Sequence, residues 1–219
     1  MINTYLPIGI SLKNRSCLIV GGGNVALRKI ETLLDYECKI TVIAPAPVEK
    51  IEYFAKSGKL VLEKREYKSS EASSFGIAIS ASDKREVNKT VSDDCNKAQV
   101  PVNVVDDPQL CTFVFPAVIK RENLTIAVST DGKSPFLAGH LRLILEEIFP
   151  DRWSKIAKHA SDFRIKVRDR WPKDPKMQAS CYWRFVNAEW KEILKKKTNE
   201  VEEELVGMLD GSEEEEEKK

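Results

Sequence analysis

Residues 16–34 read SCLIVGGGNVALRKIETLL, and this stretch decides the fold. The apolar residues 17–20 predict a short buried strand, and the apolar residues after the glycines recur at helical spacing. Gly21, Gly23 and Ala26 fill the three places of the dinucleotide fingerprint G-x-G-x-x-G/A, in the strand–turn–helix context that it requires. There the first place allows a tight turn, the second lets the backbone approach a pyrophosphate, and the third lets helix pack on strand. A dinucleotide-binding loop is our interpretation, with a plain tight turn as the alternative.

The composition is that of a globular protein, with 42% hydrophobic and 32% charged residues in a chain of 219. No apolar run approaches the ~20 residues that span a bilayer, and the N-terminus has no signal-peptide pattern. The five cysteines form no C-x-x-C pair and the chain has two histidines, which argues against a structural zinc site. We therefore expect a cytoplasmic protein with no membrane partner and no metal site.

Strand and helix patterns alternate through the first half of the chain. Strands are expected at residues 17–20, 38–43, 59–65, 75–80 and 100–105, and helices after the glycines, at 48–56 and at about 85–97. This alternation predicts a parallel sheet with helices on both faces. Because ligands of such sheets bind outside the carboxyl ends of the strands, residues 21–25, 80–83 and 103–107 should share one crevice. We expect an α/β, Rossmann-like domain over residues 1–111.

The pattern changes after Pro108. Residues 112–119 and 124–129 are apolar strand candidates, separated by a charged turn at 120–123. Ser134 and Pro135 are typical of a helix start, and this helix should end before Pro150. A hairpin and one apolar helix make too little core to stand alone. We therefore predict that residues 112–150 form a small α+β dimerisation segment of a homodimer.

The remainder of the chain should be helical and basic. Residues 152–197 hold 14 Lys and Arg against 5 Asp and Glu, and the chain ends in EEEEEKK. We expect a basic helical domain over residues 151–210 and a disordered acidic tail over 211–219. The basic surface is either simply solvated or a site for a polyanion. No nucleic-acid partner is expected, because no zinc-finger or RNP-type motif is present and the acidic tail would compete.

Four stretches carry a resemblance to a known family: LPIGISLKNRSCLIVGGGNVALRK, AISASDKREVN, VPVNVVDDP and TFVFPAVIKRENLTIAVSTDGKSPFLAGHLR. In order and spacing they resemble the siroheme-synthase type precorrin-2 dehydrogenases, some of which are also sirohydrochlorin ferrochelatases. The resemblance covers roughly residues 5–150. It implies oxidation of precorrin-2, a tetrapyrrole, to sirohydrochlorin, with NAD taking the hydride, and a homodimer interlocked after Pro108. Iron insertion is expected to be slow or absent, because no metal-ligand cluster is seen.

The resemblance implies that Asp106 is catalytic. At the carboxyl end of a strand it is placed to act as a general base, and a turn aspartate before Pro108 is the alternative. On the substrate side we place Thr130, where some members carry a serine that can be phosphorylated, together with Ser134 and His140. A core or interface position is the ordinary interpretation of His140, and a metal-handling residue at the dimer cleft is the alternative. The glycine fingerprint, the crevice predicted at the strand ends and the family resemblance together predict the cofactor-binding residues. They are Gly21, Gly22, Gly23, Asn24, Val25, Pro45, Ala46, Ser82 and Asp83.

The cofactor should be NAD rather than NADP. At the end of the second strand, Ala44 and Pro45 stand where many NAD-binding folds have an acid for the ribose 2′-hydroxyl, and no arginine replaces it. A non-catalytic dinucleotide sensor remains the alternative to an enzyme. Such a sensor would bind the cofactor tightly and turn over no tetrapyrrole.

Overall fold

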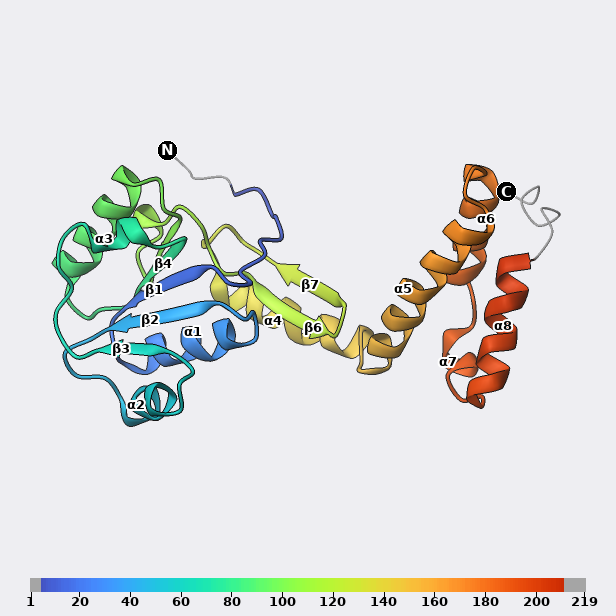
Figure 1. Cartoon of the computed structure of the whole chain (residues 1–219), viewed down its shortest axis with the longest axis horizontal. Coiled ribbons are helices and arrows are strands. Elements are labelled where there is room, and N and C mark those ends of the chain that lie inside the picture. The colour runs from blue at the N-terminus through green and yellow to red at the C-terminus, as the bar shows by residue number, and fades with distance from the viewer. Residues whose placement is uncertain (1–4, 211–219) are drawn as a thin grey trace. The chain divides into compact units, whose positions relative to one another are not determined.

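The computed structural model describes residues 5–210, and the chain divides into two units (Figure 1). The first unit holds the residues up to 115 and residues 129–134, and the second holds residues 116–128 and those from 135 onward. The hairpin and helix of the predicted segment 112–150 therefore group with the C-terminal helices. The predicted acidic tail, residues 211–219, lies outside the described residues. No helix between residues 5 and 210 is long and apolar enough to cross a membrane.

The first unit is built on a sheet of five parallel strands in the order β3-β2-β1-β4-β5. The strands are β1 (Ser16–Val20), β2 (Lys39–Ile43), β3 (Val61–Glu63), β4 (Ile77–Ser80) and β5 (Val102–Val104). The helices between them are α1 (Asn24–Leu34), α2 (Glu49–Lys56) and α3 (Arg85–Lys97), with 3₁₀ turns η1 (Glu71–Ser74) and η2 (Pro108–Leu110). This confirms the predicted Rossmann-like class. The strand order switches direction between β1 and β4.

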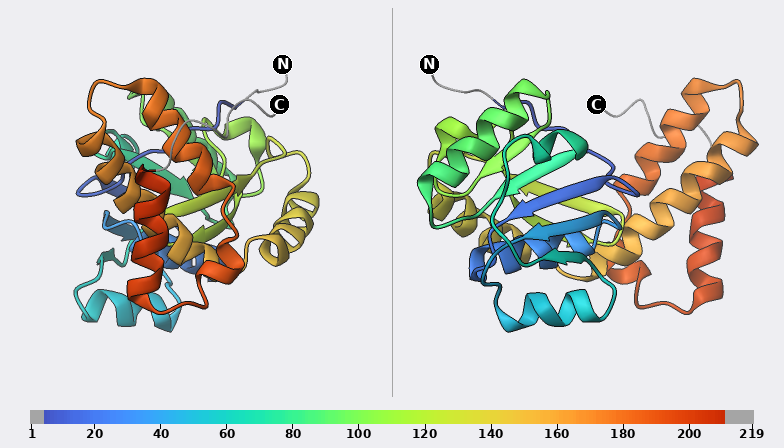
Figure 2. Two further views of the ribbon diagram at one scale, coloured as in Figure 1. Left: turned by 90° about the vertical axis from the view of Figure 1, so that its right-hand side faces the viewer. Right: turned by 60° about the vertical axis from the view of Figure 1, so that its left-hand side comes forward.

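Helices cover both faces of this sheet (Figures 1 and 2). Cys17 and Ile19 of β1 pack in the apolar cluster that includes residues of α1 and α2, whereas Leu18 and Val20 pack in the cluster that includes residues of α3 and η1. A strand buried on both faces needs apolar residues at consecutive positions. The uninterrupted run before the glycines therefore places β1 at the centre of the sheet.

One predicted strand is wrong over its first half. The chain forms no strand at residues 112–116, and β6 (Ala117–Arg121) begins later. The reason is that the amides of Thr112 and Phe113 both donate to the carbonyl of Val102, at 2.8 and 3.3 Å, so the segment turns across β5 instead of running along it. Phe113 and Phe115 pack against the core cluster on the α1 face of the sheet, which accounts for the apolar pattern.

The second unit contains the antiparallel pair β6 and β7 (Leu124–Val128) followed by helices. The turn between them is shorter than the predicted 120–123, because Arg121 belongs to β6 and pairs with Leu124 of β7. Helix α4 (Pro135–Ile148) begins at the predicted proline. The others are α5 (Arg152–Arg170), α6 (Pro175–Val186), α7 (Trp190–Ile193) and α8 (Thr198–Asp210). Phe163, Phe185 and Trp190 lie in the core of these last helices.

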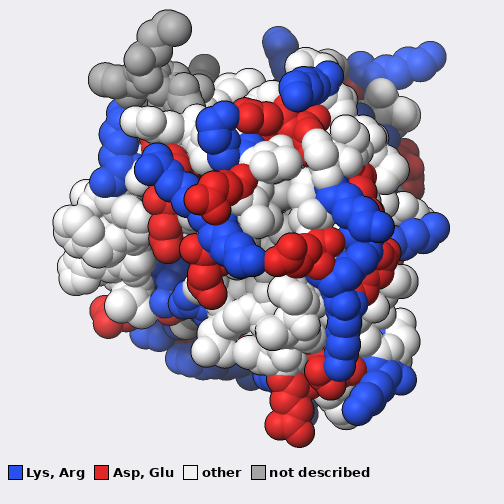
Figure 3. All heavy atoms as spheres, turned by 90° about the vertical axis from the view of Figure 1, so that its left-hand side faces the viewer, with Lys and Arg blue, Asp and Glu red and all other residues white. Residues whose placement is uncertain are grey.

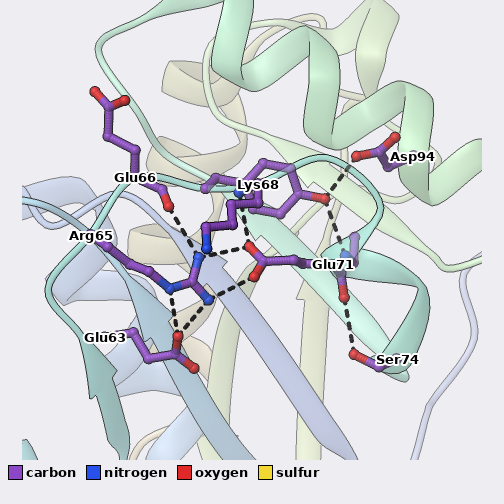
Figure 4. Close-up of polar contacts among 9 residues, drawn as sticks. Glu63, Arg65, Glu66, Lys68, Glu71, Ser74 and Asp94 are labelled. Carbon is purple, nitrogen blue, oxygen red and sulfur yellow. Dashed lines mark hydrogen bonds and ion pairs between the residues drawn. The ribbon is translucent and has the colours of Figure 1, made fainter.

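Two polar clusters fix the segment between β3 and β4 (Figure 4). In the first, the guanidinium of Arg65 donates to both carboxylate oxygens of Glu71, at 2.9 and 2.7 Å, and to Glu63 at 2.8 Å. The backbone amide of Lys68 donates to the same Glu71 carboxylate at 2.8 Å. A two-point arginine–carboxylate pair sets orientation as well as distance, so the turn before η1 is held in one geometry.

The second cluster surrounds Asp94 of α3, a buried carboxylate. It accepts hydrogen bonds from the hydroxyl of Tyr67 at 3.0 Å, from the amide of Ser70 at 2.6 Å and from the hydroxyl of Ser69 at 3.2 Å. Burial alone would raise the pKa of Asp94, but these hydrogen bonds outweigh it and lower that pKa. The cluster anchors the chain before η1 to α3.

Candidate active site

The loops after β1, β2 and β4 meet at the carboxyl edge of the sheet. The amide of Gly21, after β1, donates to the carbonyl of Ile43 of β2 at 3.0 Å, and the amide of Ala81, after β4, donates to the carbonyl of Val20 at 2.7 Å. This is the switch point of the strand order, where open parallel sheets bind their ligands. Figure 3 views the molecule from the side toward which the strands point in Figure 1, and acidic and basic side chains are interspersed there.

The three glycines differ in what excludes a side chain. Gly21 has φ +119°, and a Cβ there would lie 2.2 Å from the carbonyl oxygen of Ala81. A Cβ at Gly22 would lie 2.7 Å from Cα of Pro47, whereas a Cβ at Gly23 would meet no atom within 4 Å. The fold therefore requires glycine at the first two positions, and it leaves open space at Gly23. A dinucleotide fits this space, because close approach of a pyrophosphate needs a residue without a side chain there.

The start of α1 carries the hydrogen-bond donors for such a ligand. Gly23 is the N-cap and supplies no side-chain cap, and the first turn holds no acidic residue. The amide of Leu27 already bonds to the Gly23 carbonyl, but the amides of Asn24, Val25 and Ala26 donate to no other described residue. Unpaired amides at the positive end of a helix dipole form a site for phosphate.

The loop after β2 lies against the glycine loop. The amide of Val48 donates to the carbonyl of Gly22 at 2.8 Å. Ala44 is buried, while Pro45 and Ala46 are exposed beside it. The residues assigned to the cofactor from the first two loops are thus brought together, and the loop at 44–47 presents neither an acid nor an arginine.

The loop after β4 is held by Asn88, which sequence reasoning missed. Its Oδ1 accepts from the hydroxyl of buried Ser80 at 2.7 Å and from the amide of Ser82 at 3.2 Å, and its Nδ2 donates to the Ser82 carbonyl at 2.8 Å. Ser82 is half-buried and Asp83 is exposed. The available signal was the polar residue in the first turns of α3, close to a serine inside a buried strand.

Asp106 lies in the turn after β5 with φ +61°, in the left-handed region. Few residues other than glycine adopt this conformation, although aspartate does so more often than most. Asp106 lines a depression of about 440 Å³ together with Arg85, Asn88, Val105, Asp107, Pro108 and Gln109. Across this depression the Arg85 guanidinium lies 3.7 Å from the Asp107 carboxylate.

Lys29 of α1 belongs to the electrostatic environment of Asp106, and sequence reasoning missed it too. Its ammonium lies 4.0 Å from the centre of the Phe115 ring. Burial, followed by the charge of Arg28, lowers the pKa of Lys29, and Asp106 acts in the opposite direction. The ammonium of Lys29 therefore interacts electrostatically with the predicted general base from another element.

The residues assigned to the substrate are divided between the two units. The hydroxyl of Thr130 accepts from the amide of Ser134 at 3.1 Å, in a loop that lies beside the turn of Asp106, since a Cβ at Gly132 would be 3.9 Å from Cβ of Pro108. His140 is exposed on α4 of the second unit. Between residues 5 and 210 no group of three or more His, Cys, Asp or Glu could hold a metal ion.

Two family models match the chain. One described as "Putative NAD(P)-binding" matches residues 8–117, and one described as "Sirohaem biosynthesis protein central" matches residues 121–148. Together they cover the sheet domain and the segment up to the end of α4.

Curated relatives and one solved structure are also similar to the chain. The siroheme synthase of Ruthia magnifica is 35% identical over 208 residues, which are 95% of this chain and 44% of the relative. That of Methylococcus capsulatus is 42% identical over 168 residues, 77% of this chain and 35% of the relative. The chain thus spans less than half the length of these curated relatives. The solved structure titled "SirC, precorrin-2 dehydrogenase" matches with a TM-score of 0.71 at 21% identity, over 93% of this chain and 98% of the SirC chain. This likeness shows that the two chains share a fold.

Proposed function

The chain belongs to the NAD(P)-binding family that matches its residues 8–117, and we propose that it is an NAD-dependent dehydrogenase that oxidises precorrin-2 to sirohydrochlorin in siroheme biosynthesis. The observation that carries the proposal is that two features lie at the carboxyl edge of one parallel sheet. Open space at Gly23 beside the unpaired amides of α1 fits a pyrophosphate. Asp106, at the end of the same sheet, fits a general base. The siroheme synthase relatives supply the substrate class.

In this reaction the substrate loses a hydride and a proton. NAD supplies the hydride acceptor when it is bound. The amides of Asn24 and Val25 would bind its phosphates, and Pro45, Ala46, Ser82 and Asp83 would hold it from the loops after β2 and β4. The carboxylate of Asp106 accepts the proton. Thr130 and Ser134 lie beside that turn and contact the tetrapyrrole, with His140 as a further substrate residue.

NAD is proposed in preference to NADP. A 2′-phosphate is normally held by an arginine at the end of the second strand, and residues 44–47 are Ala-Pro-Ala-Pro. Calorimetric titration of the protein with each cofactor measures the preference. Tighter binding of NADP would overturn it.

The test of the chemistry is Asp106→Asn. Asparagine keeps the size of the side chain and tolerates the left-handed backbone, but it takes up no proton at neutral pH. Loss of a general base costs about 10²–10⁴-fold in rate, so sirohydrochlorin formation, followed spectrally, should fall by that factor while NAD binding persists. Asp107→Asn is the matched control and should keep most of the activity. A wild-type rate from Asp106→Asn would remove Asp106 from its role, and no NADH from wild type with fresh precorrin-2 would refute the proposed function.

A homodimer is part of the proposal. Six apolar residues of α4 are exposed by 37–83%: Phe136, Leu137, Leu141, Leu143, Ile144 and Ile148. Apolar surface on this scale is typical of an interface. We assign residues 112–150 to dimerisation and residues 151–210 to a basic helical domain whose charge suits a substrate rich in carboxylates.

A further inference from the structure

Asn88 fixes the orientation of one peptide at the candidate cofactor site. Its Oδ1 accepts from the amide of Ser82 and its Nδ2 donates to the carbonyl of the same residue, at 3.2 and 2.8 Å. The hydroxyl of Ser80, which is fully buried, donates to the same Oδ1 at 2.7 Å. A side chain that bonds both polar groups of one residue and is itself anchored to a buried strand leaves Ser82 a single orientation.

The hydroxyl of Ser82 still has its proton to donate. Its oxygen accepts from the amide of Lys84 at 3.2 Å. Its proton is donated to no other described residue, and the amide and carbonyl of Ser82 are both engaged by Asn88. The carbonyl oxygen of the preceding residue, Ala81, lies only 2.2 Å from the position that a Cβ of Gly21 would take. The hydroxyl proton of Ser82 is therefore a donor on a loop that touches the glycine loop.

We propose that Asn88 is a positioning residue for the cofactor: it holds the loop at residues 80–82 so that the Ser82 hydroxyl donates a hydrogen bond to the bound dinucleotide. This inference rests on the proposed function, because it requires a dinucleotide in the crevice beside Gly23. The proposed role of Asn88 differs from a purely structural role in one respect. The contribution of Asn88 to cofactor affinity passes through Ser82.

The experiment is a double-mutant cycle on NAD affinity, measured by calorimetry well below the unfolding midpoint of every variant. Ser82→Ala removes one hydrogen bond and should weaken NAD binding about 2- to 10-fold. Asn88→Ala releases the loop and should weaken NAD binding by about the same factor, because its contribution passes through Ser82. The double variant should bind like Asn88→Ala alone, because residues that act through one another are not additive. The matched control is Asn96→Ala on the same helix, whose Nδ2 bonds to Ser92; it should bind NAD like wild type.

Two outcomes would overturn the inference: an NAD affinity of Asn88→Ala within twofold of wild type, or effects of the two substitutions that simply multiply. A lowered unfolding midpoint with unchanged affinity would show a structural role only. If Asn88→Ala does not fold, Asn88→Asp serves in the cycle, because it keeps the acceptor oxygen and the size but loses the donor to Ser82. Its added charge is present in both the single and the double variant, so the direct effect of that charge on the dinucleotide cancels in the cycle. A wild-type protein that binds no dinucleotide would instead refute the proposed function.

Discussion

The same substitution at two glycines of one loop should have opposite consequences. Alanine in place of Gly23 should weaken dinucleotide binding and leave the fold stable, whereas alanine in place of Gly21 should destabilise the fold itself. The contrast follows from what a Cβ meets: nothing within 4 Å at Gly23, and the backbone of Ala81 at 2.2 Å at Gly21. Thermal unfolding and NAD titration of both variants therefore separate packing from function.

The expected stability of Gly23→Ala is close to that of wild type. Gly23 has φ −82° and ψ −173°, a conformation that any residue adopts. Replacing a glycine there gains about 0.4–1 kcal/mol by restricting the unfolded chain. Alanine is a poorer N-cap than glycine and costs about 0.5–1 kcal/mol. These terms offset each other, so the unfolding midpoint should move by less than about 4 °C.

Gly21→Ala carries two penalties that exceed the gain from restricting the unfolded chain. A residue with a Cβ in this region of positive φ costs about 1–3 kcal/mol, and overlap with a backbone atom adds about 1–3 kcal/mol of overpacking. The sum of about 2–6 kcal/mol should lower the midpoint by roughly 5–20 °C for a chain of this size.

Gly23→Ala should weaken binding because it increases the distance between the pyrophosphate and the backbone amides of α1. A methyl group moves the pyrophosphate away from the amides of α1, and each hydrogen bond to a charged group contributes about 1.5–3 kcal/mol. Losing one or two of them weakens NAD by about 10- to 10⁴-fold. Gly207→Ala, in open space on α8, is the control for both assays. Wild-type affinity of Gly23→Ala would refute the site, and a midpoint as low as that of Gly21→Ala would refute the explanation from packing.

Two further predictions concern assembly and pH. Light scattering at micromolar concentration should give twice the chain mass of 24.8 kDa, and Leu143→Glu, but not Glu147→Gln on the same helix, should yield monomers; a wild-type monomer would refute the dimer. Asp94→Asn should lose about 1–3 kcal/mol of stability at pH 7 because a buried, hydrogen-bonded carboxylate is removed. Since the folded pKa of Asp94 is lowered, its stabilising effect is complete above the unfolded value of about 3.9 and disappears as pH falls through the folded value. Urea unfolding from pH 7 to pH 3 measures this, and an equal gap between wild type and variant at every pH would contradict it.

Local patterns predicted the sheet domain because its elements follow from the chain itself. Helix α3 begins and ends where the sequence placed it, at residues 85 and 97, since apolar positions at helical spacing are intrinsic to the segment. The edge strands β3 and β5 are shorter than predicted, at three residues each. Their length depends on how far the neighbouring strand extends. Residues 112–115 are apolar because they cover a core cluster, and periodicity does not distinguish such a segment from a strand.

The candidate site was predictable only where a motif or a resemblance names the residue. Gly23 follows from the fingerprint and Asp106 from the family resemblance, together with its place at a strand end. The role of Asn88 arises from its contact with Ser82, six residues away across the β4–α3 turn. That of Lys29 arises from a contact with Phe115, far along the chain beyond β5. No spacing rule encodes such contacts. They became visible only when the elements were placed together.

Backbone strain alone does not mark the site. Besides Asp106, positive φ is found at Asn14, Glu37, Ser70, Gln99, Glu122 and Asp131 among the described residues other than glycine. What distinguishes Asp106 is that it also lines a depression and interacts electrostatically with Lys29, a cation whose pKa burial lowers. Gly23 shows the reverse case, a glycine that neither backbone conformation nor packing requires. A residue type that the fold itself does not require is expected at a position where a bound ligand requires it. Gly23 and Asp106 are thus the two positions from which the proposed cofactor and the proposed chemistry can be tested separately.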